Sequence, residues 1–257
     1  FTSLEKQSHD DKLQYRLGWM LLNGIGTEKD VLQARSYFEK AALVGNSFAA
    51  YQLGRLYLGG EGILKNVPEA LHWLNLSAKQ KNQFAEYALG CLYLKGENVP
   101  KDVAKAISYL KSAAIKGNEF AEYRLGKLYL TGEDVPKNVE TALQYLTASA
   151  KQGNQYAQYT LGKLYLMGKD ILKDKEEAVK WFTLSAAQGN IYAQFFLDHI
   201  DEFKEPSVML TATRLLHHMS RIIGDTAPAR IPPNQRADRK QTECLAMHIS
   251  EDFIPRA

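Results

Sequence analysis

Cysteine, long apolar runs and strong net charge are all scarce in this sequence of 257 residues. The two cysteines, Cys91 and Cys244, lie far apart and provide neither a disulfide framework nor a metal-ligand spacing, which favours a reducing, cytoplasmic setting. No run of about 18 apolar residues is present, so we expect no transmembrane helix. The amino-terminal residues also lack the basic, apolar and small-residue order of a signal peptide.

The net charge of +3 is too small to indicate a nucleic-acid-binding protein by itself, since dedicated binding domains are usually more basic. Any argument for DNA must therefore use the local distribution of charge. A hydrophobic content of 45% is ordinary for a soluble globular protein, so the chain can bury a core. The chain begins at Phe1 without a methionine, and we interpret residues 1–10 as an N-terminal fragment or the end of an upstream segment.

One short pattern recurs along most of the chain. A tyrosine returns every 36 residues, and each copy is followed two and three places on by Leu-Gly. The five copies are Tyr15, Tyr51, Tyr87, Tyr123 and Tyr159. A fixed period of roughly 20 to 50 residues predicts a solenoid, in which each unit is a supersecondary element that stacks on its neighbours.

Each unit is predicted to be a pair of antiparallel helices. In the fourth unit, apolar residues step by three and four within residues 123–130 and again within residues 142–150, which is helical spacing. Gly132 and Pro136 lie between the two blocks and break the helix. The glycine of each Leu-Gly pair removes side-chain bulk so that the two helices can approach closely, and Tyr93, Tyr129 and Trp181 are expected to fill the remaining volume.

Helix ends carry residues that suit capping. The first helix of each unit is preceded by an asparagine and the second by aspartate or asparagine, whose side-chain oxygens can accept bonds from free amides. These residues are Asn46, Asn82, Asn118, Asn154 and Asn190, and Asp30, Asn66, Asp102, Asn138 and Asp174. A glycine precedes most of the first set and suits a left-handed backbone, but Lys81 replaces it once, at a cost of about 1 kcal/mol if that residue is left-handed.

The repeated pattern A-x-Y-x-L-G-x-L-Y-L-x-G, followed by S-A-x-x-G-N, resembles the Sel1-like repeat, a relative of the tetratricopeptide repeat. The resemblance covers residues 11–200. It implies an all-α, right-handed superhelical solenoid of about five repeats in residues 11–201, with the leading helices on the concave side. It also implies an adaptor that binds other macromolecules.

The pattern ends after the fifth unit. A further leading helix begins at Ile191, but its Leu-Gly pair becomes Leu197 and Asp198, which predicts that no further unit stacks there. Residues 206–223 have the apolar spacing of an amphipathic helix, and we interpret them as a capping helix. Residues 224–257 form a basic, proline-containing tail that is expected to lack stable structure by itself.

A second resemblance concerns this carboxy-terminal stretch. The segment S-V-x-L-x-A-T-R-L-x-H-H-x-S-R-I at residues 207–222, with Asp238, Arg239 and Lys240 later, resembles the carboxy-terminal region of relaxases, the mobilisation proteins of the MobA/MobL type. The family's tail continues as a basic helix, whereas residues 241–257 do not. The resemblance implies that a nuclease domain with a tyrosine and metal-binding histidines lies upstream of Phe1.

Positions that vary between repeats are free to serve recognition. On the leading helices two such positions lie three residues apart and therefore on one face. They carry several basic side chains, one tryptophan and no acidic residue, and our candidate binding residues are Arg16, Trp19, Arg55, Arg124, Lys127 and Lys163. If the leading helices line a concave groove, these side chains would attract an acidic peptide or a phosphate backbone to it. The alternative is that these charged side chains are only hydrated at the helix surface and bind no partner.

No catalytic residue, metal site or cofactor is expected. His217 and His218 are adjacent on a helix and point about 100° apart, so the pair cannot hold one ion from one face. A metal role together with His199 or His248 is the alternative, and we interpret one histidine as packing on the helix and the other as facing solvent. Cys91 has no histidine near it in the repeat pattern, and Glu86 and Glu122 are interpreted as solvated or inter-repeat residues. The sequence thus predicts a non-catalytic interaction scaffold with a protein or peptide partner, or with DNA bound by the groove or tail. The specific hypothesis is the accessory region of a conjugative relaxase, and the alternative is a free-standing bacterial adaptor in signalling or regulation.

Overall fold

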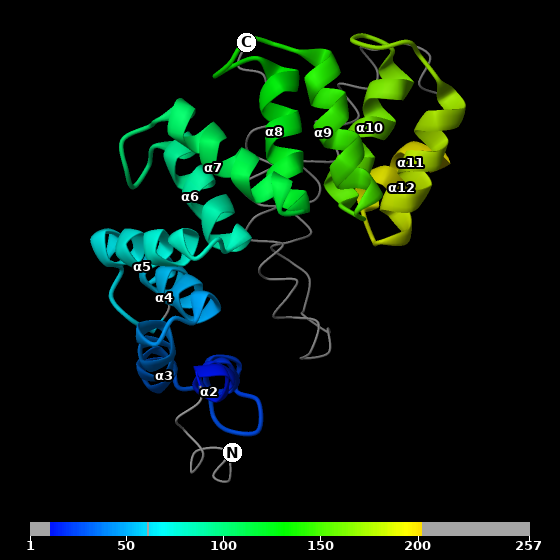
Figure 1. The fold of residues 1–257 in the computed structure, drawn as a ribbon. Coiled ribbons are helices and arrows are strands. Elements are labelled where there is room, and N and C mark those ends of the chain that lie inside the picture. The colour runs from blue at the N-terminus through cyan, green and yellow to red at the C-terminus, as the bar shows by residue number, and fades with distance from the viewer. Residues whose placement is uncertain (1–10, 61, 202–257) are drawn as a thin grey trace. The chain divides into compact units, whose positions relative to one another are not determined.

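The computed structural model of the protein describes residues 11–60 and 62–201, and within them it contains helices and no strand (Figure 1). The helices, in chain order, are α2 (Asp11–Asn23), α3 (Val31–Leu43), α4 (Ser47–Gly59), α5 (Val67–Lys79), α6 (Gln83–Lys95), α7 (Val103–Ile115), α8 (Glu119–Thr131), α9 (Val139–Lys151), α10 (Gln155–Met167), α11 (Lys175–Ala187) and α12 (Ile191–Asp198). The segment 1–10, the capping helix at 206–223 and the tail at 224–257 lie outside the described residues.

The described residues from Asp11 to Asn190 form one compact unit of five helical pairs. Each leading helix from α2 to α10 packs against the trailing helix that follows it, and the trailing helices α3, α5, α7 and α9 pack against the next leading helix (Figure 1). The pairs therefore follow one another in chain order. The all-α solenoid of five repeats is therefore confirmed. The short helix α12 belongs to a second unit that begins at Ile191.

Capping side chains define where the helices begin. Asn46 accepts a hydrogen bond from the Ala49 amide at 2.9 Å, and Asp30 accepts one from the Gln33 amide at the same distance. Equivalent bonds begin the other helices from α5 to α11. Because each cap satisfies amides that have no partner inside the helix, the boundaries follow from local chemistry. The predicted capping positions in residues 30–174 are confirmed.

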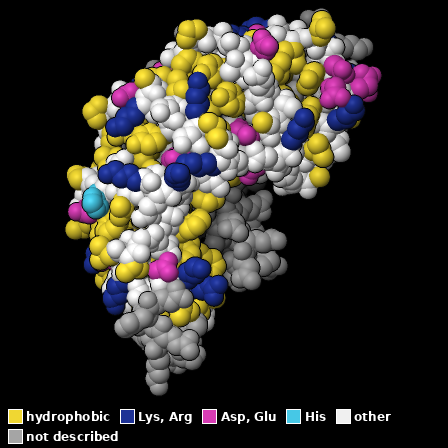
Figure 2. Space-filling view, viewed as in Figure 1, with side chains coloured by type: hydrophobic (Ala, Val, Ile, Leu, Met, Phe, Trp, Pro, Cys, Tyr) yellow, Lys and Arg dark blue, Asp and Glu magenta, His cyan; other side chains and the backbone are white. Residues whose placement is uncertain are grey.

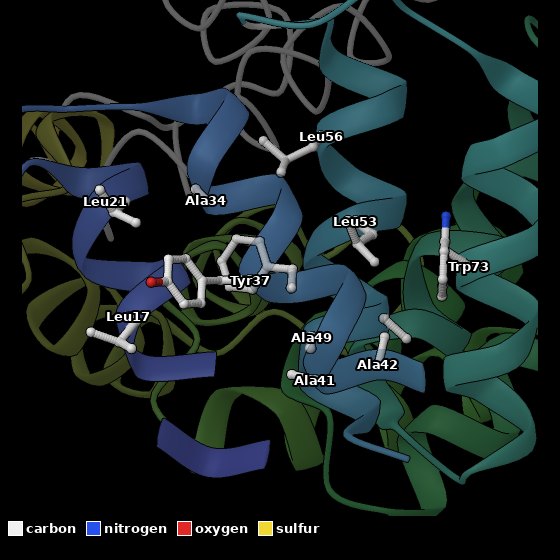
Figure 3. Close-up of a cluster of buried hydrophobic side chains, with 12 residues drawn as sticks. Leu17, Leu21, Ala34, Tyr37, Ala41, Ala42, Ala49, Leu53, Leu56 and Trp73 are labelled. Atoms are coloured by element: carbon white, nitrogen blue, oxygen red, sulfur yellow. The ribbon is translucent and has the colours of Figure 1, made fainter. Parts of the chain in front are cut away.

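The Leu-Gly glycines place two helices in direct contact. A Cβ atom added to Gly54 of α4 would lie 2.5 Å from Cγ of Leu74 in α5, and the other four glycines of this type face a leucine or phenylalanine at 2.7–2.8 Å. In the first two repeats, α2 to α5 contribute a shared cluster of buried side chains that includes Leu17, Tyr37, Leu53 and Trp73 (Figure 3). The core of the first two repeats is thus continuous across the repeat boundary.

In three of the five helical pairs, a serine links the end of the trailing helix to the start of the leading helix. Three fully buried serines donate their hydroxyl protons to the carbonyl of the first residue of the leading helix, 30 positions earlier, at 2.7 Å. These serines are Ser77, Ser149 and Ser185. Each lies near the end of its trailing helix, so the bonds show that the two helices of a pair run antiparallel, as predicted.

Two carboxylates have a different role from the one that the sequence suggested. Glu86 is 6% exposed and forms an ion pair with Lys116 at 2.5 Å, and Glu122, 9% exposed, accepts a hydrogen bond from Gln152 at 2.6 Å. Both partners lie 30 residues later in the same repeat. The prediction that these glutamates are solvated or pair between repeats is therefore wrong, because the closing of each helical pair buries them.

Lys81 is the one residue other than glycine with positive φ in the part of the chain that the structure describes, at 63°. The predicted left-handed backbone is therefore confirmed. We expect Lys81→Gly to raise the free energy of unfolding by about 0.5–1 kcal/mol, because glycine adopts this conformation without steric cost. Urea unfolding of the two proteins measures the difference. The reverse change, Gly153→Lys, where φ is 106°, is expected to lower stability, and equal midpoints for all three proteins would contradict the account.

Candidate functional site

The candidate site is one side of the leading helices, which we call the leading-helix face. Helical spacing of three and four residues brings Phe48, Tyr51 and Arg55 to the same side of α4. Gln52 lies on this side as well, four residues after Phe48 and three before Arg55. The positions equivalent to these four in the other leading helices complete the face. They include the predicted residues Arg16, Trp19, Arg124, Lys127 and Lys163, the tyrosines of the repeat, and Phe84, Phe120 and Tyr156.

Aromatic rings join successive leading helices along this face. Ring centroids lie 6.3 Å apart between Tyr15 of α2 and Phe48 of α4, and again 6.3 Å apart between Phe48 and Phe84 of α6. Farther along, the distance is 6.1 Å both for the pair Tyr87 and Phe120 and for the pair Tyr123 and Tyr156. The face is therefore continuous from α2 to α10. The second ring of each pair was not predicted from the sequence, although an aromatic residue recurs there every 36 residues from Phe48.

Basic side chains lie over some of these rings. The Arg55 guanidinium carbon lies 5.8 Å from the centroid of Tyr51, and the Lys163 amine lies 5.7 Å from that of Tyr159. Both pairs are four residues apart on one helix, and both distances allow a cation–π attraction. Burial raises the pKa of Tyr51 above its ordinary value, although the Arg55 charge acts in the opposite direction.

The predicted binding residues differ widely in exposure. Arg16 is exposed and Trp19 is 38% exposed, whereas Arg55 and Lys163 are partly buried. In contrast, Arg124 is only 7% exposed and Lys127 only 6%. The leading-helix face therefore presents exposed side chains on its first helices and buried cations on α8.

Electrostatic effects show that the cations of α8 lie close to the neighbouring leading helices. Burial, and then the like charge of Lys127, lower the pKa of Lys163 to about 8. On the other side, burial and the neighbouring Cys91 raise the pKa of Tyr87 well above its ordinary value, while the Arg124 charge lowers it. Residues of α6, α8 and α10 thus interact across the repeats.

The described part of the chain was searched for side chains that could hold a metal ion. No cluster of three or more histidine, cysteine, aspartate or glutamate side chains there could hold a metal ion. Cys91 is a free, partly buried thiol on the leading-helix face, and His217 and His218 lie outside the described residues. None of the helices in residues 11–60 and 62–201 is long and apolar enough to cross a membrane.

Helical pairs that stack through shared cores define the class of the protein, an α-solenoid of helix-turn-helix repeats. The chain belongs to the Sel1 repeat family, whose repeat matches residues 12–46, 47–82, 83–118, 120–154 and 155–190. Sel1 repeats typically act as scaffolds for protein interactions. No match was found among curated proteins.

Several solved structures are similar to this chain. A Sel1 repeat protein from Oxalobacter formigenes is 34% identical with a TM-score of 0.69, over 72% of this chain and 75% of that one. The protective antigen c5321 of uropathogenic Escherichia coli is 32% identical with a TM-score of 0.68, over 76% of this chain and 43% of that one. The immunity protein Pa5087 of Pseudomonas aeruginosa is 26% identical with a TM-score of 0.53, over 76% of this chain and 72% of that one.

Proposed function

We propose that the repeat domain, residues 11–201, is a non-catalytic scaffold that binds a partner protein through its leading-helix face. The supporting observation is a group of large rings that remain exposed beside cations on the first helices. Trp19 is 38% exposed, Phe48 49% and Phe84 37%, and Arg16 and Arg55 lie on the same face. Tryptophan, other aromatic residues and arginine are the residues most enriched in protein interfaces, where a few of them carry most of the binding energy.

The distribution of charge favours a protein partner over DNA. On the side shown in Figure 2, lysine and arginine side chains are scattered among acidic and hydrophobic ones without a continuous basic area. The whole chain has 32 basic and 29 acidic residues. On the leading-helix face, Arg124 and Lys127 are too deeply buried to lie along a phosphate backbone. DNA binding needs many exposed cations, because each phosphate contact contributes through the release of counterions.

The relaxase hypothesis is narrower and depends on other residues. The segment 207–222 and residues 238–240 lie outside the described residues. The similar proteins named above are a Sel1 repeat protein, a protective antigen and an immunity protein, and none is described as a DNA-mobilisation protein. An accessory region of a conjugative relaxase therefore stays a prediction, with a free-standing bacterial adaptor in signalling or regulation as its alternative. The coding sequence upstream of Phe1 decides between them, because a relaxase requires a histidine triad and a catalytic tyrosine there.

The test of the scaffold function uses a double variant of α4. A partner captured from the native host is first identified and purified, and its affinity is then measured by calorimetry. We expect Phe48→Ala with Arg55→Glu to weaken binding at least about tenfold, since loss of a central aromatic and an arginine contact costs 1.4 kcal/mol or more. The helical circular dichroism and the melting temperature of the free protein are expected to change little.

A matched control lies on a trailing helix. Leu184 of α11 is 49% exposed, as Phe48 is, so Leu184→Ala removes a similarly exposed apolar side chain from another surface. We expect this variant to bind the partner as the unmodified protein does. Unchanged affinity of the α4 double variant, or equal losses in both variants, would overturn the assignment of the leading-helix face. If a short DNA duplex binds with a steep salt dependence, and only when α4 is unmodified, the ligand of this face is DNA and not a protein.

A further inference from the structure

Arg55 of α4 is a cation that has no carboxylate partner in the described part of the chain. The side chain is partly buried, and its guanidinium donates one long hydrogen bond, of 3.4 Å, to Oε1 of Gln52. It also lies 5.8 Å from the ring centroid of Tyr51. Neither contact neutralises the charge, and an arginine carries five N–H donors. Because a partly buried charge is stabilised by a counter-charge, the remaining donors of Arg55 suit an acceptor from outside the chain.

Gln52 lies beside this guanidinium and is only 8% exposed. Its carbonyl oxygen faces Arg55, and its amide nitrogen donates no hydrogen bond to a described residue. A guanidinium next to an amide donor can bind the two oxygens of one carboxylate. The pair formed by Gln52 and Arg55 is therefore suited to an anionic ligand.

Acidic residues on the first three leading helices are few and already bonded. The helix α4 contains none. Asp11, the one acidic residue of α2, accepts a hydrogen bond from Asn46 at 3.0 Å. Glu86, the one acidic residue of α6, forms an ion pair with Lys116. The positive charge of Arg55 is therefore not compensated by its own helix or by the neighbouring leading helices, and an acidic ligand is complementary to it.

Exposed rings begin next to this cation. Tyr51 contacts the Arg55 guanidinium on one side and the ring of Phe84 of α6 on the other, where the centroids lie 5.9 Å apart. Phe84 in turn lies 6.3 Å from Phe48, and these two rings are 37% and 49% exposed. Phe48 precedes Arg55 by seven residues, or two helical turns, which corresponds to about 10 Å along the axis of α4. One surface thus combines a cation with accessible rings.

We propose that Gln52 and Arg55 bind the carboxylate of an aspartate or glutamate side chain in a segment of the partner protein. A large apolar side chain of the same segment packs against Phe48 and Phe84. The two side chains are then about 10 Å apart, which corresponds to about three residues in an extended segment or about seven in a helix. The inference rests on the proposed scaffold function and adds the chemistry of the bound segment.

The neighbouring helices favour a side-chain carboxylate over the carboxylate of a chain terminus. Exposed rings lie on both sides of α4, with Trp19 on α2 and Phe84 on α6. A segment that crosses α4 can therefore continue in both directions and bury apolar side chains on either side of its acidic residue. Each ring that is covered in this way contributes apolar surface to the interface.

The first experiment selects ligands without a chosen sequence. Random peptides displayed on phage are selected on the immobilised full chain and, separately, on Arg55→Leu. We expect the unmodified protein to enrich peptides with an aspartate or glutamate about three or about seven residues from a large apolar residue. This enrichment is expected to be absent on Arg55→Leu. Failure to enrich any peptide, or enrichment of peptides without acidic residues, would overturn the inference.

The second experiment exchanges the charges, an effect that misfolding of a variant cannot imitate. An enriched peptide is synthesised with a fluorescein label, both as selected and with lysine in place of its acidic residue, and binding is measured by fluorescence anisotropy. We expect Arg55→Glu to weaken binding of the acidic peptide at least about tenfold and to strengthen binding of the lysine peptide by a similar factor.

A matched control makes the same charge change on another surface. Lys111→Glu, at an exposed position of the trailing helix α7, is expected to alter neither affinity. Equal effects of this variant and Arg55→Glu would show that only the net charge matters and would overturn the site. Absence of any gain for the lysine peptide on Arg55→Glu would also overturn it.

The remaining outcomes separate this inference from the scaffold function and from other ligands. If the native partner is lost on Phe48→Ala but binds Arg55→Leu as tightly as the unmodified protein, the scaffold function stands and the carboxylate site falls. A phosphorylated peptide or a DNA oligonucleotide that binds through Arg55 more tightly than every acidic peptide would assign the site to phosphate. A change from dimer to monomer on Arg55→Leu in analytical ultracentrifugation would assign it to a second copy of the chain. Both results overturn the inference.

Discussion

Gly54→Val is expected to lower the free energy of unfolding by about 3 kcal/mol, the upper end of the range for overpacked cores. The Cβ atom of any side chain at this position would lie 2.5 Å from Cγ and 2.7 Å from Cδ2 of Leu74, and 3.2 Å from the carbonyl oxygen of Ala70. Leu74 is fully buried and cannot move aside without loss of its own packing. The better helix propensity of valine recovers only a few tenths of a kcal/mol.

The same helix contains a matched control. Gly59 is the last residue of α4, and a Cβ atom added there would have no heavy atom within 4 Å outside its immediate neighbours. Gly59→Val is therefore expected to change stability by less than about 0.5 kcal/mol. Guanidinium unfolding followed by circular dichroism compares the two variants. If their midpoints coincide, the close contact between α4 and α5 does not determine the stability of the second repeat.

Most of the fold follows from the sequence because the signals are local and repeated. The caps at Asn46 and Asp30 act within one helical turn, and the left-handed backbone at Lys81 follows from the glycines that occupy its place in other repeats. The close contact at Gly54 follows from a residue without a side chain at a fixed position. Each of these features depends on residues within one repeat. Because the same residue types recur in several repeats, the sequence provides the same evidence several times.

The candidate site was predicted less completely, because burial depends on neighbours that periodicity does not reveal. Arg16 and Arg124 occupy the same position of their repeats, yet Arg16 is exposed and Arg124 is buried, with only 7% of its surface exposed. The repeat spacing predicts the side of the helix on which a side chain lies, but it does not predict how deeply neighbouring residues bury it. The pairing of Glu86 with Lys116 has the same origin, since residues 30 apart meet only after the two helices have closed.

Phe38 provides the largest expected single effect on stability. The side chain is fully buried, its ring lies against Gly18 of α2, and its centroid is 5.8 Å from that of Tyr15. Phe38→Ala is expected to lower the free energy of unfolding by about 3–5 kcal/mol, because both the transfer of the ring and the remaining cavity contribute. The repeats provide the control, since the equivalent residue is leucine in the second, third and fourth repeats and phenylalanine in the fifth, namely Leu74, Leu110, Leu146 and Phe182. Phe38→Leu is therefore expected to cost less than about 1.5 kcal/mol.

The location of this loss tests how the repeats are coupled. In a solenoid each repeat is stabilised by its own packing and by its nearest neighbours, so damage in the first repeat is expected to stay near it. We expect hydrogen exchange of Phe38→Ala to show lost protection in α2 and α3, a smaller loss in α4, and nearly unchanged protection in α8 and α9. Equal losses from α2 to α9 would instead show one cooperative unit. In that case a partner bound on the first leading helices would also stabilise the repeats that it does not contact.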